Sequence, residues 1–170
     1  MSEHIHIVPY DPNWVQKFEE EKVLIQNTIG PWITGGINHI GSTSIPGLSA
    51  KPIIDIMVGV ESLEASKPCI DLLAKIDYQY FPYKTDQMHW FCKPSPEHRT
   101  HHLHIVETNG EQYKARLAFR DYLIAHPDKA AEYETLKKGL AEKFKDDREA
   151  YTQAKADFVK EVLSLNNPLG

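Results

Sequence analysis

The segment 52–60 is almost entirely apolar, and one carboxylate, Asp55, stands in the middle of it. Side chains alternate along a strand, so a strand here would have two chemically different faces. One face carries Ile54, Ile56 and Val58, and the other carries Ile53, Asp55 and Met57. A charge on a strand that is otherwise suited to burial needs polar partners. The sequence therefore predicts a fold in which the Asp55 face of this strand forms a polar site.

A hydroxyl-rich loop precedes this strand. It contains Gly41, Ser42, Thr43 and Ser44, whose backbone N–H groups and hydroxyls are of the kind that hold a phosphate. A carboxylate facing the same space would suit a metal-bound nucleotide, because Mg²⁺ or Mn²⁺ takes oxygen ligands and shares them with phosphates. Lys51 is a further candidate for phosphate binding. The alternative is an ordinary loop whose hydroxyls bond the local backbone.

A second group of polar residues lies in the segment 99–107, which predicts another strand. Alternation puts His102 and His104 on one face of it and Leu103 on the other. If this strand lies near the first, one sheet face carries Asp55, His102 and His104, with Arg99 at its entrance. Imidazoles there could bind a metal, bond a phosphate or, for His104, transfer a proton. The alternative is that both histidines simply occupy a half-exposed sheet face.

Periodicity and helix-breaking residues divide the chain into a mixed part, 1–109, and a helical part, 110–170. The first part predicts strands over 4–10, 37–40, 52–60, 78–83, 88–93 and 100–107, and helices over 11–28 and 64–75. The second part predicts three helices separated near 126–128 and 146–147. We expect a single domain of the α+β class. A small mixed sheet would carry helices on one face, the site on its open face, and the C-terminal helices as one wall.

Composition restricts the classes of function. The chain has 170 residues, a net charge of -5 and 41% hydrophobic residues, so it lacks the strong positive field of a non-specific nucleic-acid binder. It has no apolar run long enough to span a membrane and no N-terminal signal pattern, so we expect a cytoplasmic protein. Gly-x-Gly-x-x-Gly and Gly-x-x-x-x-Gly-Lys-Ser/Thr loops are absent. The expected partner is a nucleotide or phosphorylated small molecule, and the oligomeric state is left open.

Several stretches resemble the GrpB family. They are 8–14, 39–55, 102–104, 119–123 with 126–127, and the group Tyr151, Ala154 and Lys155. The central block is long and distinctive, and the likeness spans nearly the whole chain. The resemblance implies a fold of the nucleotidyltransferase superfamily of the polymerase-beta type. It also implies a likeness to a domain that is fused to dephospho-CoA kinase in some bacteria.

The active pattern of that superfamily is a Gly-Ser pair at a helix start, an acid-x-acid pair on the next strand and a third acid on a later strand. Its three carboxylates bind two divalent metals. The resemblance places Gly41 and Ser42 at the first element and Asp55 at the first acid. Met57 stands at the second acid, and the later strand offers His104 in place of the third. Because Mg²⁺ prefers oxygen ligands, this set predicts a poor two-metal site.

Three functions follow from this departure. The first is a nucleotidyltransferase-like protein that binds a metal-bound nucleotide through Asp55, with His104 assisting proton transfer. The second is a catalytically inactive nucleotide-binding module. The third is a hydrolase in which Asp55, His102 and His104 bind a softer divalent metal. A separate residue, Arg120, is expected to pair with a neighbouring carboxylate rather than to enter the site.

Overall fold

The computed structural model describes residues 7–95, 97–144 and 147–166. Its centre is a five-stranded mixed sheet in the order β1-β2-β5-β4-β3. Strand β2 pairs parallel with β5, and the other neighbours pair antiparallel. The strands are β1 (Ile33–Ile40), β2 (Ile54–Val60), β3 (Gln79–Tyr80), β4 (His89–Pro94) and β5 (Arg99–Glu107). This confirms the α+β class and the mixed sheet.

Helices α1 (Asn13–Ile29) and α2 (Pro68–Ala74) cover one face of the sheet. The Asp11 carboxylate accepts a hydrogen bond from Asn13 N at 2.9 Å, which caps the start of α1. The core beneath these helices is mainly apolar, since the large side chains of α1 meet the inward side chains of β2, β5 and β4, although the buried Glu21 of α1 bonds Tyr78 and Lys93. It includes Trp14, Phe18, Ile25, Cys69, Leu73, Ile54, Ile56, Val58, Leu103, Ile105 and Phe91.

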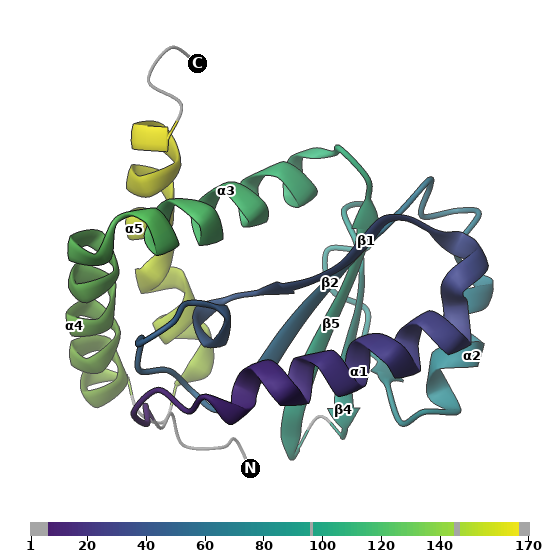
Figure 1. Ribbon diagram of the computed structural model, residues 1–170, viewed down its shortest axis with the longest axis horizontal. Helices are drawn as coiled ribbons and strands as arrows, with labels where there is room; N and C mark the ends of the chain where they lie inside the picture. Colours follow the sequence, from purple (N-terminus) through teal and green to yellow (C-terminus); the bar gives the residue numbers. More distant parts are fainter. Residues whose placement is uncertain (1–6, 96, 145–146, 167–170) are drawn as a thin grey trace.

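The opposite face of the sheet is not fully open, which differs from the expectation. Helix α3 (Glu111–Ala125) crosses it, so α1 and α3 lie on opposite sides of the sheet (Figure 1). Tyr113 and Leu117 of α3 pack on Met57 and Val106. The apolar side chain at position 57 explains the difference, because it gives a helix something to bury on this face.

Helices α4 (Pro127–Lys143) and α5 (Arg148–Asn166) lie beside α3 and away from the sheet, at the left of Figure 1. The loop between β1 and β2 reaches them. Ile45 and Leu48 of this loop join a second core with Leu123, Tyr133 and Val162. The C-terminal helices therefore form a wall against the hydroxyl-rich loop. Within the described residues, none of the helices combines the length and apolar character that a membrane-spanning segment requires.

Four predicted elements differ from the structure by three residues or more. Residues 4–6 of the predicted strand 4–10 lie outside the described residues, and Val8 makes only a single bridge, with Ala50. Pro9 follows Val8 and has no N–H to extend the ladder. The strand predicted over 78–83 is confined to β3, near Pro82, and the helix predicted from 64 begins at Pro68. Strand β1 begins earlier than predicted.

The sheet depends on a close approach between β1 and β2. A Cβ on Gly59 would lie 2.8 Å from the backbone Cα of Gly35 and 2.5 Å from Thr108 Oγ1. We therefore expect Gly59→Ala to destabilise the protein by about 1–3 kcal/mol, because overpacking forces the backbones apart. Urea denaturation followed by circular dichroism measures this change.

Gly139 provides the matched control, since a Cβ there meets no atom within 4 Å. It lies inside α4, where alanine has the higher helix propensity. Gly139→Ala should leave stability unchanged or raise it by up to about 1 kcal/mol. Equal midpoints for Gly59→Ala and the unmodified protein would contradict the packing argument.

Candidate functional site

The polar face predicted from the sequence is present where β1, β2 and β5 run side by side. Parallel pairing of β2 with β5 sets Asp55 beside His102 and Met57 beside His104. Opposed residues of a ladder project to the same face, so all four side chains lie on the face that α3 crosses. Asp55 also pairs with Ile40, the last residue of β1. The expectation that the two segments would meet at this face is met.

Both histidines approach one oxygen of the carboxylate. His102 Nδ1 forms a hydrogen bond with Asp55 Oδ1 at 3.2 Å, and His104 Nε2 lies 3.6 Å from the same atom. The second oxygen faces Gly41, where a Cβ would lie 2.5 Å from Asp55 Oδ2. The φ of Gly41 is 73°, a conformation that also favours glycine. Gly41 thus allows the chain to pass close to the carboxylate.

The surroundings keep this carboxylate charged. Burial raises the pKa of Asp55, but the hydrogen bond from His102 and the nearby His104 outweigh burial and lower it well below its ordinary value. Burial and the charge of Arg116 lower the pKa of His104 to about 4, although Asp55 opposes them. His104 is therefore neutral at pH 7. A neutral imidazole is suited to positioning Asp55 and is less suited to donating a proton.

The outer nitrogens of the two imidazoles have no partner. His102 Nε2 and His104 Nδ1 are both buried and make no hydrogen bond. Nε2 of the neutral His104 faces Asp55, so with the proton on that nitrogen its Nδ1 carries a lone pair and can only accept. Buried polar atoms are rarely left unpaired, and these two unpaired nitrogens lie on the polar face predicted from the sequence.

Arg116 is a site residue that the sequence analysis missed. It projects from α3 and interacts electrostatically with both Asp55 and His104. Its Nε donates to Gln112 Oε1 at 3.2 Å, and no other hydrogen bond of this side chain occurs among the described residues. The available signal was its spacing from Arg120, because residues four apart share one face of a helix.

Arg120 has the structural role expected for it. Its Nε pairs with Asp121 Oδ1 at 2.8 Å, and its Nη1 donates to His39 O at 3.1 Å. The second contact ties α3 to the end of β1. Arg120 therefore helps hold the helix from which Arg116 reaches the carboxylate.

The three hydroxyls of the hydroxyl-rich loop differ in their hydrogen bonds. Thr43 is buried, and its Oγ1 lies 2.9 Å from His39 Nε2 and 3.4 Å from Ile53 O. Ser44 Oγ donates to Gly41 O at 2.5 Å. Two of the three predicted phosphate hydroxyls therefore bond within the protein. The Ser42 hydroxyl makes no hydrogen bond within the described residues, and Ser42–Ser44 form a single 3-10 turn.

The two predicted phosphate-binding cations lie apart. Lys51 Nζ stands 5.0 Å from the ring centre of Tyr151 on α5, and Lys155 stands 4.8 Å from the same ring. Arg99 lies at the start of β5, with its guanidinium carbon 5.3 Å from the ring centre of Trp90. Lys51 thus lies against the C-terminal helices, while Arg99 lies toward the β4 side of the sheet. The geometry does not bring them to one phosphate.

The donor set does not suit a resident two-metal centre. Asp55 is the single carboxylate of the site among the described residues, and the fully buried Met57 stands where the resemblance led us to look for a second acid. Across the described ranges, no group of three or more His, Cys, Asp or Glu side chains is placed to hold a metal ion. Asp55, His102 and His104 meet through a shared oxygen, not around a common ligand space. The hydrolase hypothesis gains no support from this arrangement.

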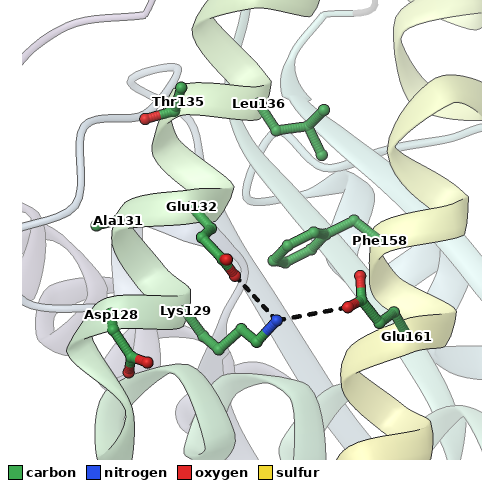
Figure 2. A pocket seen from close by; sticks show the side chains of 8 residues that line it. All are labelled: Asp128, Lys129, Ala131, Glu132, Thr135, Leu136, Phe158 and Glu161. Atoms are coloured by element: carbon green, nitrogen blue, oxygen red, sulfur yellow. Dashed lines mark hydrogen bonds and ion pairs between the residues drawn. The ribbon is translucent and has the colours of Figure 1, made fainter.

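A hollow of about 540 Å³ lies elsewhere, between α4 and α5. Figure 2 shows Lys129 crossing it between Glu132 and Glu161, at 2.9 and 3.4 Å. Three of its four charged groups are therefore paired with one another. The apolar part is contributed by Leu136 and Phe158. This hollow has no connection with the polar face of the sheet, and we do not assign the function to it.

Comparison with known proteins identifies the family. Residues 4–165 match the sequence profile of a family described as "GrpB protein". The chain belongs to the GrpB family. The glutamate-rich protein GrpB of Alkalihalophilus pseudofirmus is 40% identical over 163 residues, which cover 93% of each chain. The crystal structure of conserved protein GrpB from Enterococcus faecalis has a TM-score of 0.86 and 36% identity, over 95% of this chain and 96% of that one.

Two further likenesses are more distant. A dephospho-CoA kinase of Mycolicibacterium paratuberculosis is 24% identical over 185 residues, and this GrpB chain spans 45% of that protein's length. A Cid1 poly(U) polymerase structure with bound Mg 3'-dATP has a TM-score of 0.51 and 10% identity, over 77% of this chain and 41% of that one. The second likeness shows a shared nucleotidyltransferase-like fold.

The wall beside the site contains an unusual buried lysine. Lys137 is 1% exposed, and its Nζ donates to Ser49 O at 2.8 Å, while Ser49 N donates to Glu134 Oε1 at 2.6 Å. Burial and the charges of Lys155 and Lys51 lower the pKa of Lys137 to about 7, and Glu134 opposes them. In this GrpB protein, α4 is therefore fixed to the loop by an ammonium group that readily loses its proton.

This environment predicts how stability depends on pH. The unfolded chain holds the Lys137 proton up to about pH 10.4, whereas the folded chain releases it near pH 7. Between these pH values the unfolded state binds more protons than the folded state. The destabilisation caused by burying Lys137 therefore decreases as the pH rises. Relative to Lys137→Met, the unmodified protein should gain stability from pH 7 to 9.5, measured by urea denaturation.

Lys138→Met is the matched control because Lys138 is the next residue on α4 and its side chain is 56% exposed. Parallel pH profiles for the unmodified protein and Lys137→Met would show that Lys137 keeps its ordinary titration.

Proposed function

We propose that this GrpB protein binds a magnesium–nucleotide complex, or a similar metal-bound phosphorylated ligand, at the carboxylate of Asp55. The observation that carries the proposal is that the two carboxylate oxygens of Asp55 have different surroundings. Oδ1 is fixed by His102 and approached by His104, whereas Oδ2 faces Gly41. The Asp55 side chain is 28% exposed. One oriented, charged oxygen therefore remains for a ligand.

One such oxygen suits a metal that arrives with its phosphates. Mg²⁺ is usually held through one or two carboxylates together with substrate phosphates and waters, and not by a cage of protein atoms. Without a cation, the Asp55 carboxylate would repel a nucleotide. The metal complex of the nucleotide removes that repulsion, so the metal is treated as part of the ligand.

The residues around Asp55 supply suitable contacts for phosphates. The Arg116 guanidinium lies within electrostatic reach of Asp55 and adds positive charge from α3. On the other side, Ser42 offers a hydroxyl beside Gly41. These two groups and the metal would contact different phosphate oxygens. Among the predicted phosphate-binding residues, Gly41 and Ser42 thus remain in the proposed site, and Thr43 and Ser44 support the loop.

Binding is favoured over nucleotidyl transfer by the same donor set. Two-metal transfer needs carboxylates that hold both the attacking and the leaving oxygen, and this chain has Met57 and His104 where the resemblance would put the second and third acids. The low pKa of His104, about 4, also argues against its use as a general acid at neutral pH. We therefore propose a nucleotide-binding function in which the fold positions the ligand without two-metal chemistry.

Calorimetric titration tests this function directly. ATP, GTP, CTP, UTP, CoA and dephospho-CoA are each titrated in the presence of Mg²⁺ and again with EDTA. CoA-type nucleotides are included because a dephospho-CoA kinase contains a related region. We expect binding that needs Mg²⁺. Asp55→Asn should weaken it at least about tenfold, since the amide keeps the shape and loses the charge that contacts the metal.

Asp77→Asn is the control, because Asp77 is exposed, lies outside the site and has a positive φ that Asn also tolerates. It should bind as the unmodified protein does, and thermal unfolding should confirm that both variants fold. Undiminished affinity in Asp55→Asn, or the absence of binding by every nucleotide, would refute the proposal. Pyrophosphate release from a bound nucleoside triphosphate would instead favour nucleotidyl transfer.

A further inference from the structure

Three aromatic side chains stand beside the Asp55 site on the β4 side of the sheet. We infer that this aromatic wall, formed by Phe81, Tyr83 and Trp90, stacks against the base of the bound nucleotide. The inference rests on the proposed function and adds a second part to it. The Asp55 region would hold the phosphates, and the wall would hold the ring.

The wall is a connected group of rings. The ring centre of Trp90 lies 5.9 Å from that of Phe81 and 6.1 Å from that of Tyr83, with interplanar angles of 84° and 60°. Edge contacts of this kind fix the rings relative to one another. Trp90 also packs on the apolar residues beneath α3. Binding of a base against these rings would therefore restrict the protein side chains little further.

The wall leaves much of its apolar surface in solvent. Phe81 and Tyr83 are each 46% exposed, and they are the only aromatic members of the set of exposed large hydrophobic side chains among the described residues. Each of them contacts the ring of Trp90. Neighbouring exposed rings mark a binding surface more strongly than scattered apolar residues do.

Cations surround these rings. Lys84 Nζ stands 5.4 Å from the ring centre of Tyr83, and the Arg99 guanidinium carbon stands 5.3 Å from that of Trp90. Arg116 interacts electrostatically with Tyr83 as well as with Asp55. Aromatic faces mixed with positive charge complement a ligand that carries both a planar ring and phosphates. A nucleotide has this combination, and a purely apolar partner does not.

The wall and the Asp55 site are continuous. Trp90 is paired with His104 in the sheet, so the two share a face, and its ring centre lies 5.2 Å from that of His102. His102 in turn bonds Asp55. Because adjacent strands are about 4.8 Å apart, the wall lies two strands from the carboxylate. A ribose with its first phosphates can bridge such a separation.

The loop that carries Tyr83 is held in place. Gln112 on α3 donates to Gln87 Oε1 at 2.6 Å, and the N–H groups of Gln87 and Met88 donate to Lys84 O at 2.8 and 3.1 Å. These bonds connect the loop to the helix that also carries Arg116. The aromatic wall and the proposed phosphate contacts thus belong to one supported arrangement.

The test compares a ligand that has a base with one that lacks it, namely ATP and inorganic tripolyphosphate, both with Mg²⁺. ATP should bind more tightly to the unmodified protein. In Phe81→Leu/Tyr83→Leu, ATP affinity should fall about fivefold or more, while tripolyphosphate affinity should stay unchanged. Val23→Ala, which alters an exposed apolar residue of α1, is the control. Trp90 fluorescence should respond to ATP and not to tripolyphosphate, and Trp90→Phe should remove the response.

The outcomes separate the two proposals. If neither ligand binds, the proposed function fails, and the inference fails with it. If both bind equally and the leucine variant matches the unmodified protein, the inference alone is wrong. If that variant changes the molecular mass in solution, measured by light scattering, without changing ATP affinity, the wall is a contact surface for a second copy and not a base-binding surface.

Discussion

The parallel pairing of β2 with β5 is the constraint on which the site depends. It brings together segments that are far apart in the chain, and its register places Asp55 beside His102. A register shifted by one residue would turn Asp55 or the histidines into the apolar core under α1. The side chains that β2 and β5 turn toward α1 are mainly apolar, so such a shift would bury a charge without its present partners. The same packing that stabilises the sheet therefore selects the arrangement of the site.

Burial of the carboxylate shapes the second face of the sheet. Its apolar half, around Met57 and Val106, is covered by α3, whereas its polar half surrounds Asp55. One helix serves both halves, because Tyr113 packs on the sheet and Arg116 extends toward the carboxylate. A helix that covered the face completely would desolvate Asp55 further. Burial raises the pKa of this carboxyl and so opposes the lowering by the two histidines. Partial coverage satisfies both requirements.

Alternation in the sequence was sufficient to predict the faces of Asp55, His102 and His104, since it is a property of one strand at a time. It could not predict the role of Arg116, because this depends on the angle at which α3 crosses the sheet. Hydroxyl chemistry was likewise insufficient for Thr43. Its partner His39 lies on β1, and only the folded loop brings them to 2.9 Å. The face on which a strand residue lies could be predicted from the sequence, whereas contacts that depend on how helices and loops pack could not.

Gly41 lies against the carboxylate of the protein itself. In a phosphate-binding loop, glycine lets the backbone approach the ligand. Here the nearest atom to a Cβ at this position would be Asp55 Oδ2, so glycine is already required by the carboxylate of the protein itself. The loop and Asp55 are therefore coupled in the fold, because any side chain at position 41 would collide with this carboxylate.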